Sequence, residues 1–78
     1  MKTYYPSNYS IDQLVNKRII IEKESVKEIV DLLCFNSSKA EVLIDYCDGT
    51  GETRTYWMSK AKLMIWLQPL LRYHHYIL

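Results

Sequence analysis

Glycine and proline are scarce in this sequence, which has two of each among its 78 residues. Disordered and low-complexity chains are usually rich in these residues and poor in apolar ones. This chain is 49% hydrophobic and 13% aromatic. The composition therefore excludes a disordered chain, and we expect residues 1–78 to form a single α+β domain.

Neither sign of charge is in clear excess, because ten Lys and Arg residues face nine Asp and Glu residues. Nucleic-acid-binding domains usually carry a strong positive excess. An acidic mimic of a nucleic acid would carry the opposite excess. The net charge of +1 argues against both classes.

Residues suited to metal binding or catalysis are also scarce. Cys34 and Cys47 form no C-x-x-C pair, and the histidines, His74 and His75, are adjacent. Neighbouring residues on a helix or strand point to different sides, so the two imidazoles do not converge on one site. A nucleophile would also need a base and an orienting group. We expect no enzyme, no metal and no cofactor.

Two acidic or glycine-rich features have structural explanations. Asp45, Asp48 and Glu52 gather around a predicted turn without the spacing of a calcium loop, so we interpret them as turn and solubility residues. The Gly49–Gly51 segment is too short for a phosphate loop and precedes a strand rather than a helix.

Long hydrophobic runs are absent. The longest, from Leu63 to Leu71, is interrupted by Gln68 and Pro69 and is shorter than the roughly 20 residues that cross a bilayer. We expect no membrane segment and a cytoplasmic location with reduced thiols. A disulfide between Cys34 and Cys47 would require the predicted helix before Cys34 to pack on the hairpin described next.

The clearest local pattern is a β-hairpin between Glu41 and Ser59. Apolar and polar residues alternate on both sides of the turn residues 48–51, which tolerate positive φ. A loop of Asp48 and Gly49 alone would place Asp45 opposite Glu52. A loop of residues 48–51 instead places Asp45 opposite Arg54 and is preferred. In this register Leu43 faces Tyr56 and Val42 faces Trp57, and the face with Val42, Ile44 and Trp57 is the better core candidate.

Capping signals and periodicity predict the remaining elements. Ser10-x-x-Gln13 and Ser25-x-x-Glu28 resemble capping boxes, and Ser59 can cap a helix that Pro69 ends or kinks. We therefore predict a three-stranded sheet, with strands at about 18–23, 41–47 and 53–58. Helices at about 11–15, 26–35 and 60–68 pack on it. The first two strands are parallel in a βαβ unit or antiparallel, and the C-terminal tail packs as a strand, packs as a helical turn or binds a partner.

The surplus of apolar and aromatic residues suggests an interaction surface. Seven tyrosines are many for this length, and tyrosine and arginine are enriched at interface hot spots. We expect a protein partner, either a second copy in a homodimer or a larger host protein. The predicted partner-binding residues are Tyr4, Tyr5, Tyr9, Arg72, Tyr73 and Tyr76.

The residue usage, rich in Ile, Lys, Tyr and Asn and poor in Ala, is typical of an AT-rich genome. Short proteins of this kind without catalytic motifs are often encoded by phages or mobile elements. We therefore hypothesise a small inhibitor or regulator of host machinery, such as an anti-CRISPR-like inhibitor, that acts by covering a surface of its target.

The alternative hypothesis is a small nucleic-acid-binding regulator. Its basic residues would contact phosphates while tyrosines stack on bases. The predicted contact residues are Lys17, Arg18, Arg54, Lys60 and Lys62.

Overall fold

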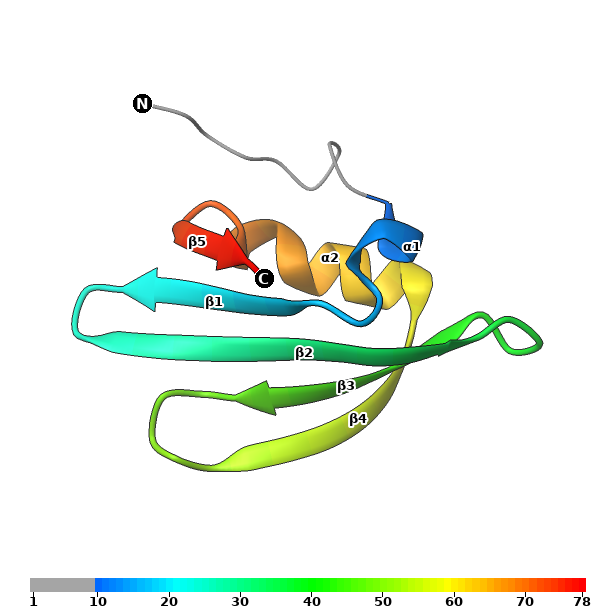
Figure 1. Ribbon diagram of the computed structural model, residues 1–78, viewed down its shortest axis with the longest axis horizontal. Coiled ribbons are helices and arrows are strands. Elements are labelled where there is room, and N and C mark those ends of the chain that lie inside the picture. Colours follow the sequence, from blue (N-terminus) through cyan, green and yellow to red (C-terminus); the bar gives the residue numbers. More distant parts are fainter. Residues whose placement is uncertain (1–9) are drawn as a thin grey trace.

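A computed structural model describes residues 10–78 of the chain. The elements in order are α1 (Ile11–Leu14), β1 (Arg18–Lys23), β2 (Val26–Asn36), β3 (Glu41–Cys47), β4 (Thr53–Ser59), α2 (Lys60–Leu70) and β5 (His74–Ile77). The strands form one five-stranded antiparallel sheet in the order β4-β3-β2-β1-β5 (Figure 1). These residues form a small compact α+β fold with two helices.

The predicted three-stranded sheet with three helices is wrong, chiefly because residues 26–35 form β2 and not a helix. Glu28, Val30 and Leu32 are buried on one face of β2, in strict alternation with more exposed residues. Glu24 and Ser25 form the turn between β1 and β2 rather than the start of a helix. The strand is stabilised by pairing along both its edges, a non-local effect that overrides the helical pattern.

The connection between the first two strands resolves the alternatives left open by the sequence. β1 and β2 are antiparallel neighbours joined by a tight turn, so there is no βαβ unit. The C-terminal tail packs as a strand, because β5 pairs antiparallel with the free side of β1. This pairing and the conversion of 26–35 into β2 raise the sheet from three strands to five.

The predicted hairpin register is wrong by one residue. β3 and β4 pair with Asp45 opposite Thr55, Leu43 opposite Trp57 and Val42 opposite Met58. The loop therefore contains residues 48–52, and Asp48 Oδ1 accepts hydrogen bonds from Thr50 N at 2.9 Å and Thr50 Oγ1 at 2.6 Å. A one-residue shift exchanges the two faces of a strand. Trp57 therefore leaves the predicted core and is 53% exposed.

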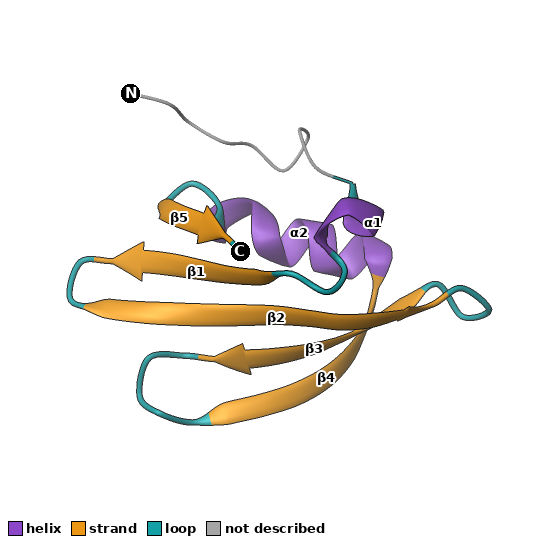
Figure 2. Cartoon of the chain, viewed as in Figure 1, coloured by secondary structure: helices purple, strands orange, loops and turns teal. Residues whose placement is uncertain are grey.

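Both helices lie on the same side of the sheet, where they enclose the core (Figure 2). α1 begins with the predicted capping box, in which Ser10 and Gln13 bond to each other's backbone N–H. α2 is capped by Ser59 and continues through Pro69 to Leu70, past its predicted end. The buried apolar side chains are Ile11, Leu14, Ile19, Ile21, Val30, Leu32, Val42, Ile44, Leu63, Leu67, Leu70 and Leu71.

The two glycines of the β3–β4 loop should differ in their tolerance of alanine. Both have positive φ, +93° at Gly49 and +96° at Gly51, so alanine costs about 1–2 kcal/mol at either position. Only at Gly49 would a Cβ also crowd its surroundings, at 3.0 Å from Lys27 O and 3.1 Å from Val26 Cβ. We expect Gly49→Ala to lower the free energy of unfolding in urea by about 1 kcal/mol more than Gly51→Ala. Equal losses would contradict this close packing.

Candidate interaction surface

The face of the sheet opposite the helices carries no helix among residues 10–78. Its side chains follow from the strand registers, because directly paired residues point to the same side. Ile20, Ile29 and Leu43 on this face keep partial exposure, whereas Ile19, Ile21 and Ile44 on the helix-covered face are fully buried. We call it the open face.

One apolar row crosses the open face through paired residues of three strands. Cys34 of β2 is opposite Leu43 of β3, which is opposite Trp57 of β4. We call these three residues the Trp57 patch. A register shift between Leu32 and Cys34 makes a β-bulge at Leu33, where another large apolar side chain is 39% exposed. The patch therefore lies between this bulge and the β4 edge.

A polar row lies beside the Trp57 patch and is internally satisfied. Arg18 binds Asp31 in a bidentate contact, with Nε at 2.8 Å from Oδ1 and NH2 at 3.1 Å from Oδ2. Thr55 Oγ1 donates to Asp45 Oδ1 at 2.6 Å. Asp31 and Asp45 face each other across β2 and β3, and these two contacts offset the repulsion between like charges.

A second apolar row lies beyond the polar one, made of Tyr76, Ile20, Ile29 and Cys47 in paired positions. Tyr76 is 46% exposed, and its hydroxyl lies 3.1 Å from His74 Nε2. The open face therefore offers two apolar rows separated by a neutralised polar row. Protein interfaces typically combine apolar and polar area in this way.

The predicted partner-binding residues are only partly brought together. Tyr4, Tyr5 and Tyr9 lie outside the described residues. Arg72 and Tyr73 lie in the turn between α2 and β5, where Lys23 Nζ is 5.1 Å from the Tyr73 ring centroid.

Tyr76 lies in β5 opposite Ile20, on the open face. Trp57, the most exposed aromatic residue described, was missed because the predicted hairpin register placed it in the core. The correct register would have identified it.

The basic residues of the alternative hypothesis do not gather into one patch. Arg18 is bound to Asp31, and Arg54 NH2 lies 3.4 Å from Glu52 Oε1. Lys60 Nζ lies over the Phe35 ring at 5.3 Å from its centroid.

Lys17 and Lys62 are exposed. Arg54 and Lys60 stand near opposite ends of β4, roughly 20 Å apart by the rise of a strand.

Glu28 is a buried carboxylate on the helix-covered face. Glu28 is only 6% exposed, and its Oε2 lies 2.8 Å from Lys23 Nζ. Burial first, and then hydrogen bonding to Glu28, raises the pKa of Tyr46 to about 12. The Tyr46 hydroxyl therefore stays protonated at neutral pH, and its ring meets Trp66 edge-on with centroids 5.1 Å apart. Glu28 is thus held by neighbours that suit a structural role.

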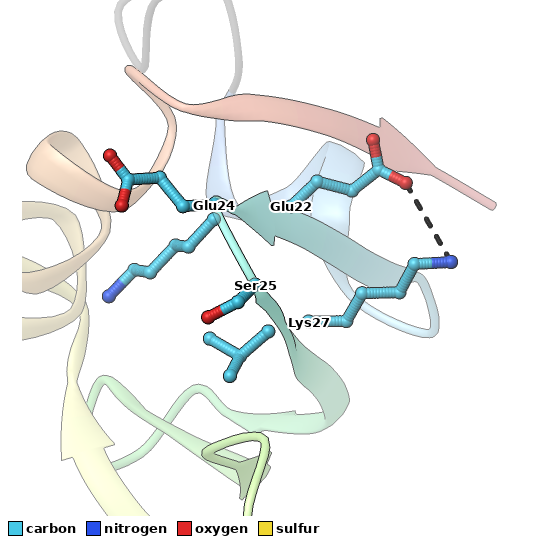
Figure 3. A pocket seen from close by; sticks show the side chains of 6 residues that line it. Glu22, Glu24, Ser25 and Lys27 are labelled. Carbon is cyan, nitrogen blue, oxygen red and sulfur yellow. Dashed lines mark ion pairs between the residues drawn. The ribbon is translucent and has the colours of Figure 1, made fainter.

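A hollow of about 350 Å³ surrounds the β1–β2 turn and is mainly charged (Figure 3). Lys27 Nζ lies 3.7 Å from Glu22 Oε2 on one side, and Glu24 and Ser25 lie at the turn itself. The lining holds no histidine or cysteine, and no hydrogen bond joins the Ser25 hydroxyl to a base among the described residues, so no activated nucleophile is seen there. Within residues 10–78, no three His, Cys, Asp or Glu side chains are grouped to hold a metal.

The two thiols are free and far apart. Cys34 pairs with Leu43, and Cys47 lies further along β3 on the same face, roughly 13 Å away by the rise of a strand. A disulfide requires Cα atoms within about 7 Å. An intrachain bridge between them is therefore excluded, and the helix expected to carry Cys34 is replaced by β2.

No protein-family model, curated protein or solved structure matches the chain. Among the described residues, no helix has the length and apolar character needed to span a bilayer.

Proposed function

We propose that the chain is a non-enzymatic protein-binding module whose binding surface is the open face, centred on Trp57. The observation that carries the proposal is the 53% exposure of this tryptophan beside Leu43 and Cys34, on a sheet face that no described helix covers. Tryptophan is among the residues most enriched at binding hot spots. Exposed apolar area of this kind typically marks an interaction site.

The polar row of the open face also supports a protein partner over a nucleic acid. Arg18 is neutralised by Asp31, and Asp45 lies in the same row. A surface that binds phosphates would present free cations instead. No observation on the described residues favours the nucleic-acid alternative.

A module of this size can act on a larger protein by covering part of its surface, and we propose an inhibitor or regulator of this type. The free thiol of Cys34 is exposed on the open face. An exposed thiol suits a reducing compartment, so we place the protein in the cytoplasm under this proposal.

The test compares two exposed apolar residues on opposite sides of the molecule. Trp57 lies on the open face, and Ile65 lies on α2, on the helix-covered side of the sheet, and is 72% exposed. We expect Trp57→Ala to reduce capture of cellular partners at least tenfold, whereas Ile65→Ala keeps it within about twofold. Partners are quantified by mass spectrometry after pull-down with the tagged chain, and circular dichroism checks that both variants fold.

Two outcomes would contradict the proposal. Capture that is unchanged in Trp57→Ala would remove the open face as the binding surface. Capture that disappears after nuclease treatment or at high salt would favour the nucleic-acid alternative.

A further inference from the structure

We infer that β4 pairs antiparallel with β4 of a second copy of this chain, centred on Tyr56, so that the sheet continues across a two-fold axis. The inference rests on the proposed function, because it names a second copy as one protein partner of this binding module, at the β4 edge that borders the open face. It is carried by the outer edge of β4 and by the self-complementarity of its sequence.

The β4 edge has few of the features that usually protect an edge strand. β4 is the outer strand at the bottom of Figure 1, and no described element lies beyond it. Protected edges carry proline, charged side chains, lysine above all, or bulges. Residues Thr53–Ser59 contain neither proline nor lysine, and their pairing with β3 runs without a register shift. Their one charged side chain is Arg54, near the start of the strand. The other edge, β5, is only four residues long.

The backbone groups available for pairing follow from one hydrogen bond. Lys60 N donates to Ala40 O at 3.1 Å, in the register that β3 and β4 share. In an antiparallel pair, the residues that bond a given neighbour alternate along the strand. Tyr56 and Met58 therefore bond β3, and the N–H and C=O groups of Thr53, Thr55, Trp57 and Ser59 point away from the sheet.

Tyr56 is the central residue of β4, so only a pairing centred on it overlaps the whole strand with its copy. Thr55 then lies opposite Trp57 of the second copy, and Thr53 lies opposite Ser59. All the outward backbone groups named above meet partners. Pairs of aromatic and β-branched residues are among those that stabilise sheets.

The charges that flank β4 select the same register. A pairing centred on Tyr56 places Glu52 opposite Lys60 of the second copy, and by symmetry this ion pair forms twice. A pairing centred on Trp57 would instead place Arg54 opposite Lys60, with like charges facing each other. Glu52 makes only one long contact with Arg54, at 3.4 Å, so its carboxylate is available.

This pairing would also enlarge the surface of the proposed function. Paired residues share a face, so the open faces of both copies would lie on the same side of the sheet. The two Trp57 side chains would be diagonal neighbours across the axis. A larger protein would then meet two adjoining Trp57 patches.

The register is tested by charge reversal. We expect Glu52→Lys and Lys60→Glu each to weaken dimerisation about tenfold, measured by light scattering on a size-exclusion column over a concentration series. The double variant should restore the wild-type constant, because the pair is then re-formed with exchanged signs. Lys60→Glu places an acid in the first turn of α2, which is favourable there, but it also removes the contact of Lys60 with the Phe35 ring. Circular dichroism therefore checks that both single variants fold.

A cysteine scan gives an independent readout in a chain with Cys34→Ser and Cys47→Ser. Tyr56→Cys should cross-link to its copy under mild oxidation, because the central pair brings Cα atoms within disulfide range. Thr55→Cys should not, since Thr55 faces Trp57.

A wild-type chain that is monomeric throughout, or a dimer that is indifferent to both charge reversals and does not cross-link at position 56, overturns the inference. Capture of other proteins that depends on Trp57 would still hold in that case, so the failure of the dimer and that of the proposed function are distinguishable.

Discussion

Lys23→Met is expected to lower the free energy of unfolding by about 3 kcal/mol. Lys23 Nζ is the charge partner of Glu28 Oε2 at 2.8 Å, and Glu28 Oε1 has no hydrogen-bond partner among the described residues. Methionine keeps the length of the stem but leaves a buried carboxylate without a cation. Breaking a buried ion pair in this way costs about 3–5 kcal/mol, and the partial exposure of Lys23 favours the lower end.

The same pair should be dispensable when both charges are removed together. Glu28→Leu combined with Lys23→Met replaces the pair by apolar side chains, which is often neutral or stabilising. We expect this double variant to unfold in urea within about 1 kcal/mol of the wild type. Lys27→Met is the matched control, because Lys27 is exposed and lies 3.7 Å from Glu22. Equal losses of stability in Lys23→Met and Lys27→Met would show that the buried Glu28 carboxylate does not need the charge of Lys23.

Local signals were enough to place β1, β3, β4 and the starts of both helices. The hairpin strands, the strand at 18–23, the Ser10 capping box and the Ser59 cap all lie where the sequence indicated. Residues 26–35 could not be predicted in the same way. Their apolar spacing fits a helical stripe, and their Glu, Lys and Leu residues favour helices. They form a strand because they pair with β1 on one side and β3 on the other, and some of these paired residues are far apart in the sequence.

The candidate surface depended on a detail that local rules do not decide. An opposite-charge pair between Asp45 and Arg54 favoured the wrong register, yet Thr55 satisfies Asp45 with a hydrogen bond of 2.6 Å. A surface ion pair contributes only a few tenths of a kcal/mol. In the observed register Met58 lies opposite Val42 and packs against the core in place of Trp57.

The neutralisation of Arg18 was equally hidden in the sequence. Its partner Asp31 lies directly opposite it on β2. With residues 26–35 predicted as a helix, the pairing of Arg18 with Asp31 could not be foreseen, and Arg18 remained a candidate phosphate contact. The error in one element therefore propagated to the basic residues of the alternative hypothesis.

Leu67→Ala should have a second large effect, because it removes the centre of the contact between α2 and the sheet. Leu67 is fully buried in the cluster that also contains Leu63 and Leu70. Truncating a buried leucine to alanine costs about 2–5 kcal/mol through lost burial and the cavity left behind. A core of this size supplies only about 3–5 kcal/mol of net stability. The variant should therefore be largely unfolded at 37 °C, as measured by circular dichroism.

Ile65→Ala is the matched control on the same helix. Ile65 is 72% exposed, and its substitution by alanine removes as many carbon atoms as Leu67→Ala does. We expect the free energy of unfolding to change by no more than about 0.5 kcal/mol. The difference in stability between Leu67→Ala and Ile65→Ala shows which side of α2 packs on the sheet. If Ile65→Ala were as damaging as Leu67→Ala, α2 would be covered on its outer side as well. The exposed apolar side chain of Ile65 would then belong to a second contact in solution rather than to the surface of a monomer.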